Sequence, residues 1–172
     1  MSSSALALFN GAALEDAEQV LVECCHCRRW AARVAGLRPF DSVAQLQSTA
    51  ATVWDEMGEV EWLEAFAGHP RIGDLSVLRD KYSSASKEQG QVAAADETVL
   101  QDLMQLNRDY EARHGFIFIV CASGKSAAEM RDLLRERLPL SREAELRNAA
   151  AEQAKITALR LARAFPDVEV QP

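Results

Sequence analysis

The sequence predicts an all-α protein, and three observations support this fold class. Apolar residues recur at three- and four-residue spacing over most of the chain, and only one segment has a strand-like pattern. Residues that cap or end helices separate these stretches. The chain has 172 residues, 48% apolar and 26% charged, which is a globular balance. We therefore expect a single compact multi-helix domain over 1–172, with a core at about 9–165 and short tails.

The first half of the chain is predicted to form a series of amphipathic helices. The first carries the apolar stripe Leu14, Ala17, Leu21 and Cys24, and residues 28–35 extend it after a bend. Pro39 interrupts the pattern, and Ser42 can cap the next helix. The stripe of that helix is Val43, Leu46, Ala50, Val53 or Trp54, and Met57. A short helix with Val60, Leu63 and Phe66 stops at Gly68.

The second half predicts further helices by the same reasoning. One runs from about Ser86 towards Ala95, and Asp96 can cap another that Gly115 ends. The stripe of the latter is Leu100, Leu103, Leu106 or Asn107, and Tyr110. Ser126 and Glu129 match a capping box, which opens a helix through Arg137. After Pro139, a last long helix is expected from Ser141 to Ala164.

The apolar run from Phe116 to Cys121 is the exception to this helical pattern. It has the local pattern of a buried strand, but no second convincing strand is present to pair with it. We therefore interpret it as a buried extended or helical segment.

Charge and cysteine content exclude some classes of function. The net charge of −7 disfavours nucleic-acid binding, because phosphates repel an acidic surface. No apolar run is long enough to span a membrane, and the start of the chain lacks the pattern of a secretory signal. Three of the four cysteines crowd at Cys24, Cys25 and Cys27, which fits a reducing, cytoplasmic setting.

The segment His69-Pro70-Arg71-Ile72-Gly73-Asp74 is the strongest candidate for chemistry. Pro70 pushes the preceding His69 out of the helical region, and Gly73 allows a sharp turn. The imidazole is thereby held by rigid backbone on a loop, where catalytic groups often lie. A histidine that only serves a turn is the alternative.

Glu88 and Arg160 are two further candidates. If Ser86 caps a helix, Glu88 lies in its first turn, where the helix dipole stabilises a carboxylate, and it points towards any adjacent cleft. Arg160 shares a broad face of the last helix with Leu146, Ala149, Ile156 and Leu159. A guanidinium among apolar neighbours needs a partner, either an internal Asp or Glu or an anionic substrate.

A zinc site at Cys24-Cys25-His26-Cys27 is not expected. Tetrahedral zinc sites need a second pair of ligands at a suitable spacing, and Cys121 and the other histidines are isolated. The first two cysteines are better explained as small core residues, and His114 as complementing a helix C-terminus.

Taken together, these segments resemble the OHCU decarboxylases (2-oxo-4-hydroxy-4-carboxy-5-ureidoimidazoline decarboxylases) of uric acid breakdown. The resemblance covers about 9–163, and its order and spacing are specific. In chain order the matching segments are Cys24-Cys25 with Arg29-Trp30-Ala31, Arg38-Pro39-Phe40, Trp62 to Phe66, His69 to Asp74, Glu88-Gln89, Leu106 to Tyr110, Gly115 to Ala122, and Glu152 to Leu161.

This resemblance implies a cofactor-free, metal-free carboxy-lyase that converts OHCU, a small anionic imidazoline, to (S)-allantoin and CO2. It also implies an all-helical homodimer. The family's essential residues fall on His69, Glu88 and Arg160, which we expect to converge on one pocket. The substrate-contacting positions fall on Pro70, Gln89, Ser86, Ile117, Phe118 and Ile119.

Three departures from the family pattern are present. Ala85 occupies a position that is often serine, with Ser84 and Ser86 on either side, so the sequence leaves open which serine, if either, makes that contact. His114 replaces a common aromatic, and Cys27 a common serine. Two other functions remain: an enzyme acting on a related ureido or imidazoline acid, and a noncatalytic helical interaction module.

Overall fold

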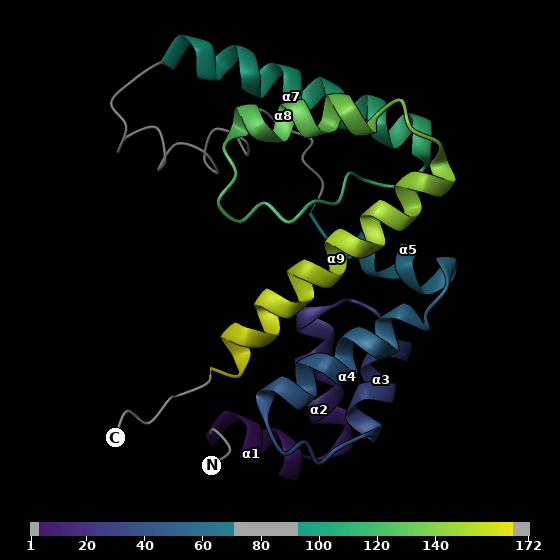
Figure 1. Ribbon diagram of the computed structural model, residues 1–172, viewed down its shortest axis with the longest axis vertical. Coiled ribbons are helices and arrows are strands. Elements are labelled where there is room, and N and C mark those ends of the chain that lie inside the picture. The colour runs from purple at the N-terminus through teal and green to yellow at the C-terminus, as the bar shows by residue number, and fades with distance from the viewer. Residues whose placement is uncertain (1–3, 71–92, 167–172) are drawn as a thin grey trace. The chain divides into compact units, whose positions relative to one another are not determined.

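The computed structural model describes residues 4–70 and 93–166, with the side chains of 93–96 outside the description (Figure 1). The described residues form α-helices and contain no β-strand, which confirms the all-α fold class. The helices are α1 Ser4–Gly11, α2 Leu14–Cys24, α3 Arg28–Gly36, α4 Val43–Asp55, α5 Glu59–Ala67, α7 Ala93–His114, α8 Ala127–Arg137 and α9 Arg142–Ala164. None of these helices is long and apolar enough to cross a membrane.

The chain divides into two units. Unit 1 comprises residues 1–68 and 150–172, and unit 2 comprises residues 69–149. Unit 1 therefore holds α1 to α5 and the C-terminal part of α9, whereas unit 2 holds α7, α8 and the first turns of α9.

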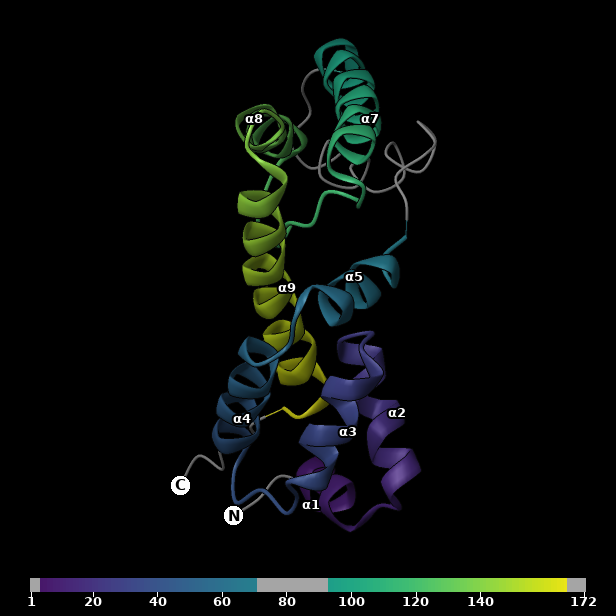
Figure 2. The same cartoon turned by 90° about the vertical axis from the view of Figure 1, so that its right-hand side faces the viewer.

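The core of unit 1 is built from the apolar faces of α2, α3 and α4, where α3 packs against both other helices (Figure 2). Trp30 is fully buried, and its indole Nε1 donates to the Ala50 carbonyl at 2.9 Å. Trp54 is buried as well, and its Nε1 donates to the Ala150 carbonyl of α9 at 2.9 Å. The two tryptophans thus fill the core while their polar atoms remain paired.

Helix α1 occupies residues that were expected to form a short tail, so that expectation is wrong for residues 4–8. Leu6 and Phe9 are buried, and the Phe9 ring packs edge-on against Phe165 with centroids 5.1 Å apart. Arg38 Nη1 donates to the carbonyls of Phe9 and Ala12, which closes the C-terminal end of α1. These long-range contacts explain why the helix forms despite its short sequence.

Helices α4 and α5 test the predicted stripes in different ways. Ser42 caps α4 as expected, because its side chain accepts from the Gln45 amide at 3.1 Å. The predicted stripe of α4 is confirmed by the burial of Val43, Leu46, Ala50, Val53 and Trp54, and Met57, which lies just past the end of the helix, is buried as well. In α5 the stripe is wrong at Val60, which is 78% exposed, while Ala65 and Phe66 are buried. A helix of nine residues offers too few repeats to fix its buried face from periodicity.

In unit 2, α7 and α8 lie side by side in both views (Figures 1 and 2). Helix α7 begins at Ala93, so Asp96 lies inside the helix and the prediction that it caps it is wrong. Gly115 ends α7 as expected, with a φ of 82° that favours glycine. Ser126 caps α8 through the Glu129 amide, as expected.

Candidate active site

His69 lies on a loop directly after α5, as the sequence predicts. Gly68 forms the C-cap of α5, and His69 and Pro70 follow outside regular secondary structure. His69 is half-buried, whereas Pro70 is exposed. The rest of the loop from Arg71, together with Ser86, Glu88 and Gln89, lies outside the described residues.

Three contacts within unit 1 fix the helix that leads into this loop. Glu64 accepts a hydrogen bond from the first backbone amide of α3, at Arg28, at 3.1 Å. Cys27 provides no side-chain cap for α3, so Glu64 supplies the negative charge that a helix N-terminus attracts. Glu61 binds Arg29 at 2.8 Å. The backbone of Gly68 approaches His26 so closely that an added Cβ would lie 2.4 Å from the His26 Cβ.

Arg160 projects from α9 at the edge of its buried face. In unit 1 that face is formed by Gln153, Thr157 and Leu161, which are all buried. Leu159 is 40% exposed, so the expectation that Arg160 shares an apolar face with it is wrong. Arg160 is half-buried, and its Nη1 donates to the Cys24 carbonyl at 3.4 Å, a long contact. No described carboxylate of unit 1 forms an ion pair with it, so the internal Asp or Glu considered from sequence is absent there.

The Phe116–Cys121 segment lies outside helices and strands and has no strand partner among the described residues, as the interpretation of an unpaired segment expected. Phe116, Ile119 and Cys121 are buried, while Ile117 and Phe118 are half-buried. Three of the predicted substrate-contacting residues therefore lie on one continuous stretch of unit 2.

A buried polar cluster, which sequence reasoning missed, lies beside this segment. Its centre is Glu145, which is fully buried and accepts from Arg137 Nε at 2.8 Å and from the Tyr110 hydroxyl at 2.7 Å. Burial and the neighbouring Glu145 carboxylate raise the pKa of Tyr110, so the phenol stays protonated and donates. The sequence gives no signal for this cluster, because Glu145 has polar neighbours at helical spacing, such as Arg142 and Asn148.

His114 is buried and binds a helix end, although not that of its own helix. Its Nε2 lies 3.0 Å from the carbonyl of Leu138, the C-cap of α8. The imidazole also packs against the Tyr110 ring with centroids 4.4 Å apart. The expected role at a helix C-terminus is confirmed, with α8 in place of α7.

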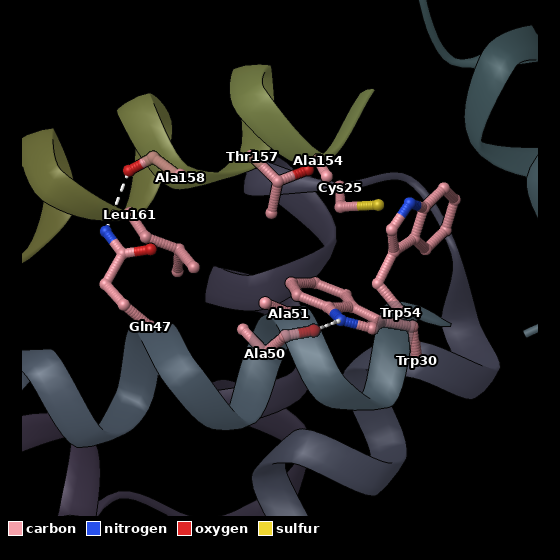
Figure 3. A pocket seen from close by; sticks show the side chains of 10 residues that line it. All are labelled: Cys25, Trp30, Gln47, Ala50, Ala51, Trp54, Ala154, Thr157, Ala158 and Leu161. Atoms are coloured by element: carbon pink, nitrogen blue, oxygen red, sulfur yellow. Dashed lines mark hydrogen bonds between the residues drawn. The ribbon is translucent and has the colours of Figure 1, made fainter. Parts of the chain in front are cut away.

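Unit 1 contains a cavity of about 40 Å³ between α4 and α9 (Figure 3). Most of its walls are apolar, and the polar atoms that border it are paired. Gln47 donates to the Ala158 carbonyl at 2.8 Å, and the Thr157 hydroxyl accepts from Gln153 Nε2 at 3.0 Å. None of the predicted site residues that the structure describes lines the cavity. Because its volume suits water-sized groups only, we do not assign the active site to it.

Cys24, Cys25 and Cys27 are buried free thiols, as expected for core residues. Burial raises the pKa of Cys24 to about 11 and that of Cys25 to about 12. Thiols with such pKa values are protonated near neutral pH, which makes them poor nucleophiles and metal ligands. The described residues contain no group of three or more His, Cys, Asp or Glu arranged to hold a metal ion.

Comparison with known proteins adds to these observations. The family model described as OHCU decarboxylase matches residues 10–162. The uric acid degradation bifunctional protein TTL of Arabidopsis thaliana is 37% identical over 160 residues, which are 90% of this chain and 49% of TTL. The chain thus spans about half of TTL. The 2-oxo-4-hydroxy-4-carboxy-5-ureidoimidazoline decarboxylase of Haloferax volcanii is 26% identical over 79% of this chain and 81% of its own.

A solved structure agrees with the sequence matches. The crystal structure of OHCU decarboxylase in the presence of (S)-allantoin is 35% identical, with a TM-score of 0.70 over 85% of this chain and 96% of that chain. This chain thus shares its overall fold with an OHCU decarboxylase. The chain belongs to the OHCU decarboxylase family.

Proposed function

We propose that this chain decarboxylates OHCU to (S)-allantoin and CO2 in the degradation of urate. The observation that carries the proposal is the family match over residues 10–162. It is supported by the likeness to the OHCU decarboxylase crystallised in the presence of (S)-allantoin, which the chain matches over 96% of that chain's length.

The chemistry of the substrate explains why no cofactor is required. OHCU carries a carboxylate and a hydroxyl on one ring carbon. When the bond to the carboxylate breaks, its electron pair moves into the adjacent unsaturated C–N unit of the ring, which therefore serves as the electron sink. The nitrogen of that unit takes up a proton, the hydroxyl loses its own proton to become a carbonyl, and a proton is added to the ureido-bearing carbon.

We assign these proton transfers to His69 and Glu88. In this proposal His69 hydrogen-bonds the hydroxyl and accepts its proton as charge develops. Glu88 orients His69 or delivers a proton to the ureido-bearing carbon from one face, which gives one enantiomer. The position of His69 at the start of a loop, directly after a helix held by Glu64 and Glu61, supports its placement by rigid backbone.

Arg160 is proposed to bind a carboxylate or carbonyl oxygen of the substrate. A charge that gripped only the departing carboxylate would oppose its loss, because catalysis requires tighter binding of the transition state than of the ground state. We therefore assign Arg160 a contact that persists through the reaction. Its support is a half-buried guanidinium for which the described residues of unit 1 provide one hydrogen-bond acceptor, a carbonyl at 3.4 Å.

The remaining substrate contacts follow the family pattern. We propose that Pro70, Gln89 and Ser86 contact the substrate, and that Ile117, Phe118 and Ile119 form a wall of the pocket. The half-burial of Ile117 and Phe118 supports a wall that keeps part of its surface available. We also propose a cytoplasmic homodimer. Neighbouring buried free thiols at Cys24 and Cys25 support a reducing compartment, and light scattering of the purified protein tests the dimer.

His69→Asn and Glu88→Gln are each expected to lower turnover by about 10²–10⁴-fold, because a placed general acid or base contributes about that much. Both substitutions keep the size of the side chain, so the circular dichroism should not change. Arg160→Lys should also be impaired, since an ammonium cannot form the two-pronged planar contact of a guanidinium. Arg163→Lys, on the exposed side of the same helix, is the matched control.

The assay generates the unstable substrate from urate in a stopped-flow instrument and follows optically active allantoin. Racemic allantoin at the spontaneous rate is expected from the His69 and Glu88 variants. Wild-type turnover and enantioselectivity in either variant would remove that residue from proton transfer. Product analysis by NMR with capture of CO2 separates decarboxylation from another reaction on a ureido acid. An absence of any turnover by the wild-type protein would favour an interaction module.

A further inference from the structure

The buried cluster around Glu145 uses every oxygen of its carboxylate. Oε1 accepts from Arg137 Nε at 2.8 Å and from the Tyr110 hydroxyl at 2.7 Å, and Oε2 accepts from Asn148 Nδ2 at 2.7 Å. The Glu145 side chain is 0% exposed and that of Arg137 12%. A buried ion pair adds little net stability, because the cost of desolvating both charges offsets their attraction. The arrangement does, however, fix the orientation of the Arg137 guanidinium.

The Nη1 nitrogen of the same guanidinium binds the apolar segment, while Nη2 is buried and has no hydrogen-bond partner among the described residues. Arg137 Nη1 donates to the Ile119 carbonyl at 2.9 Å. The Arg137 Cζ also lies 4.5 Å from the centroid of the Phe118 ring, within the range of a cation–π contact. Tyr110 meets the same ring edge-on, with centroids 5.2 Å apart. The Arg137 guanidinium thus contacts both the backbone of Ile119 and the side chain of Phe118.

The hydrogen bond from Arg137 pairs a backbone carbonyl for which the described residues provide no neighbouring strand. A buried backbone carbonyl requires a hydrogen bond, and Ile119 is only 2% exposed. Two other cations contact the ends of the segment, one through a ring and one through a carbonyl. Arg142 packs 5.7 Å from the Phe116 ring, and Lys125 Nζ donates to the Cys121 carbonyl at 2.8 Å. At Ile119, in the middle of the segment, Arg137 supplies the hydrogen bond that a neighbouring strand would otherwise donate.

We propose that Arg137, oriented by Glu145, is a positioning residue that sets the Phe118–Ile119 wall against the substrate. This inference rests on the proposed function, because that function makes Ile117, Phe118 and Ile119 the pocket wall. A wall that shifts lets the imidazoline ring tilt and admits water to the reacting carbon. Substrate affinity and the choice of the protonated face then depend on Arg137, although it does not touch the reacting atoms.

The test compares Arg137→Lys with Arg135→Lys. Lysine keeps the charge at 137 but has no planar fork to hold Glu145, the Ile119 carbonyl and the Phe118 ring together. Arg135 lies on the same helix, is 53% exposed and pairs with Asp102 at 3.2 Å, so its replacement controls for any effect of an arginine-to-lysine change on α8.

For Arg137→Lys we expect KM to rise on the order of tenfold or more, because small misplacements of a substrate are costly, while kcat changes less. The enantiomeric excess of allantoin should fall, and amide hydrogen exchange should accelerate in a peptide covering 116–121. Arg135→Lys should match wild type in all these measurements. Glu145→Gln, which keeps the shape of the side chain, should give the same pattern with smaller changes.

Two outcomes would overturn the inference. The first is wild-type KM and enantiomeric excess in Arg137→Lys despite faster exchange in the segment. The second is unchanged exchange in the segment, which would show that Arg137 does not hold it. If Arg137→Lys does not fold, the same measurements on Glu145→Gln decide. Failure of the wild-type protein to accelerate allantoin formation would instead overturn the proposed function, and with it the role of the wall.

Discussion

The buried thiols of Cys24 and Cys25 make the stability of the protein depend on pH. Both are almost completely buried, and burial raises the pKa of Cys24 to about 11 and that of Cys25 to about 12. Because desolvation disfavours the thiolate, the folded protein keeps these protons at a pH where the unfolded chain has released them.

The free energy of unfolding should therefore fall as pH rises above about 9, through the window up to the raised pKa values. Below pH 9 both states hold the thiol protons, so no loss is expected there. In urea unfolding measured from pH 8 to 10.5, the double variant Cys24→Ala/Cys25→Ala should lose less stability with rising pH than wild type. Parallel pH dependence in the two proteins would contradict the assignment.

Sequence reasoning found residues marked by their immediate neighbours in the chain and missed residues whose partners are distant in sequence. His69 stands out because Pro70 and Gly73 flank it, and the structure places it on the expected loop. Glu145 looks like an ordinary surface acid on a long helix. Its partners, Tyr110 and Arg137, are 35 and 8 residues away, and only folding brings the three together.

At the scale of elements, the junction between α5 and the His69 loop depends on one glycine. Gly68 has a φ of −75°, which any residue can adopt, so its backbone conformation does not require glycine. The requirement is spatial, because a Cβ at position 68 would lie 2.4 Å from the His26 Cβ and 2.7 Å from its Cγ.

Gly68→Ala should destabilise the protein by about 1–3 kcal/mol, the usual cost of forcing atoms into a packed region. Chemical denaturation measures this loss, and kcat/KM should fall as well because the displaced backbone leads directly into His69. Gly36→Ala is the matched control, since its added Cβ meets nothing within 4 Å. His26→Gly removes the obstructing atoms, so Gly68→Ala should cost much less in that background. If Gly68→Ala lowered the free energy of unfolding equally in the wild-type and His26→Gly proteins, the clash with His26 would not be the cause.

Helix boundaries were predicted best where a cap and a long stripe agreed. Ser42 and Ser126 both cap the helices that follow them, because a hydroxyl acceptor is a local property of the sequence. The prediction failed at α1 and at the start of α7, where Asp96 had been taken as a cap. In α1 the decisive partners are Arg38 and Phe165, which are distant in sequence.

At the scale of the whole molecule, α9 is the element that both units contain. It runs without interruption from Arg142 to Ala164, and the boundary between the units falls between Ala149 and Ala150. We expect the chain to behave as a single domain, because a continuous helix that contributes to both cores couples their unfolding.

Thermal unfolding should accordingly be one transition, with equal calorimetric and van't Hoff enthalpies. Ala151→Pro, at an exposed position just past the boundary, should break α9 at a cost of about 3 kcal/mol and split the transition in two. Ala151→Ser keeps the backbone amide and serves as the control. Two transitions in the wild-type protein would show that the units unfold independently and would end the single-domain prediction.

The sequence by itself determined the helical class, most helix boundaries, the loop position of His69 and the family. These depend on spacing, caps and turn residues, which act over a few neighbouring positions. Only the tertiary structure decided which polar groups are buried together: Arg137 with Glu145, the Ile119 carbonyl and the Phe118 ring, and Gly68 against His26. The physical reason is that a buried polar group must find a partner, and the nearest one in space is set by the packing of whole helices.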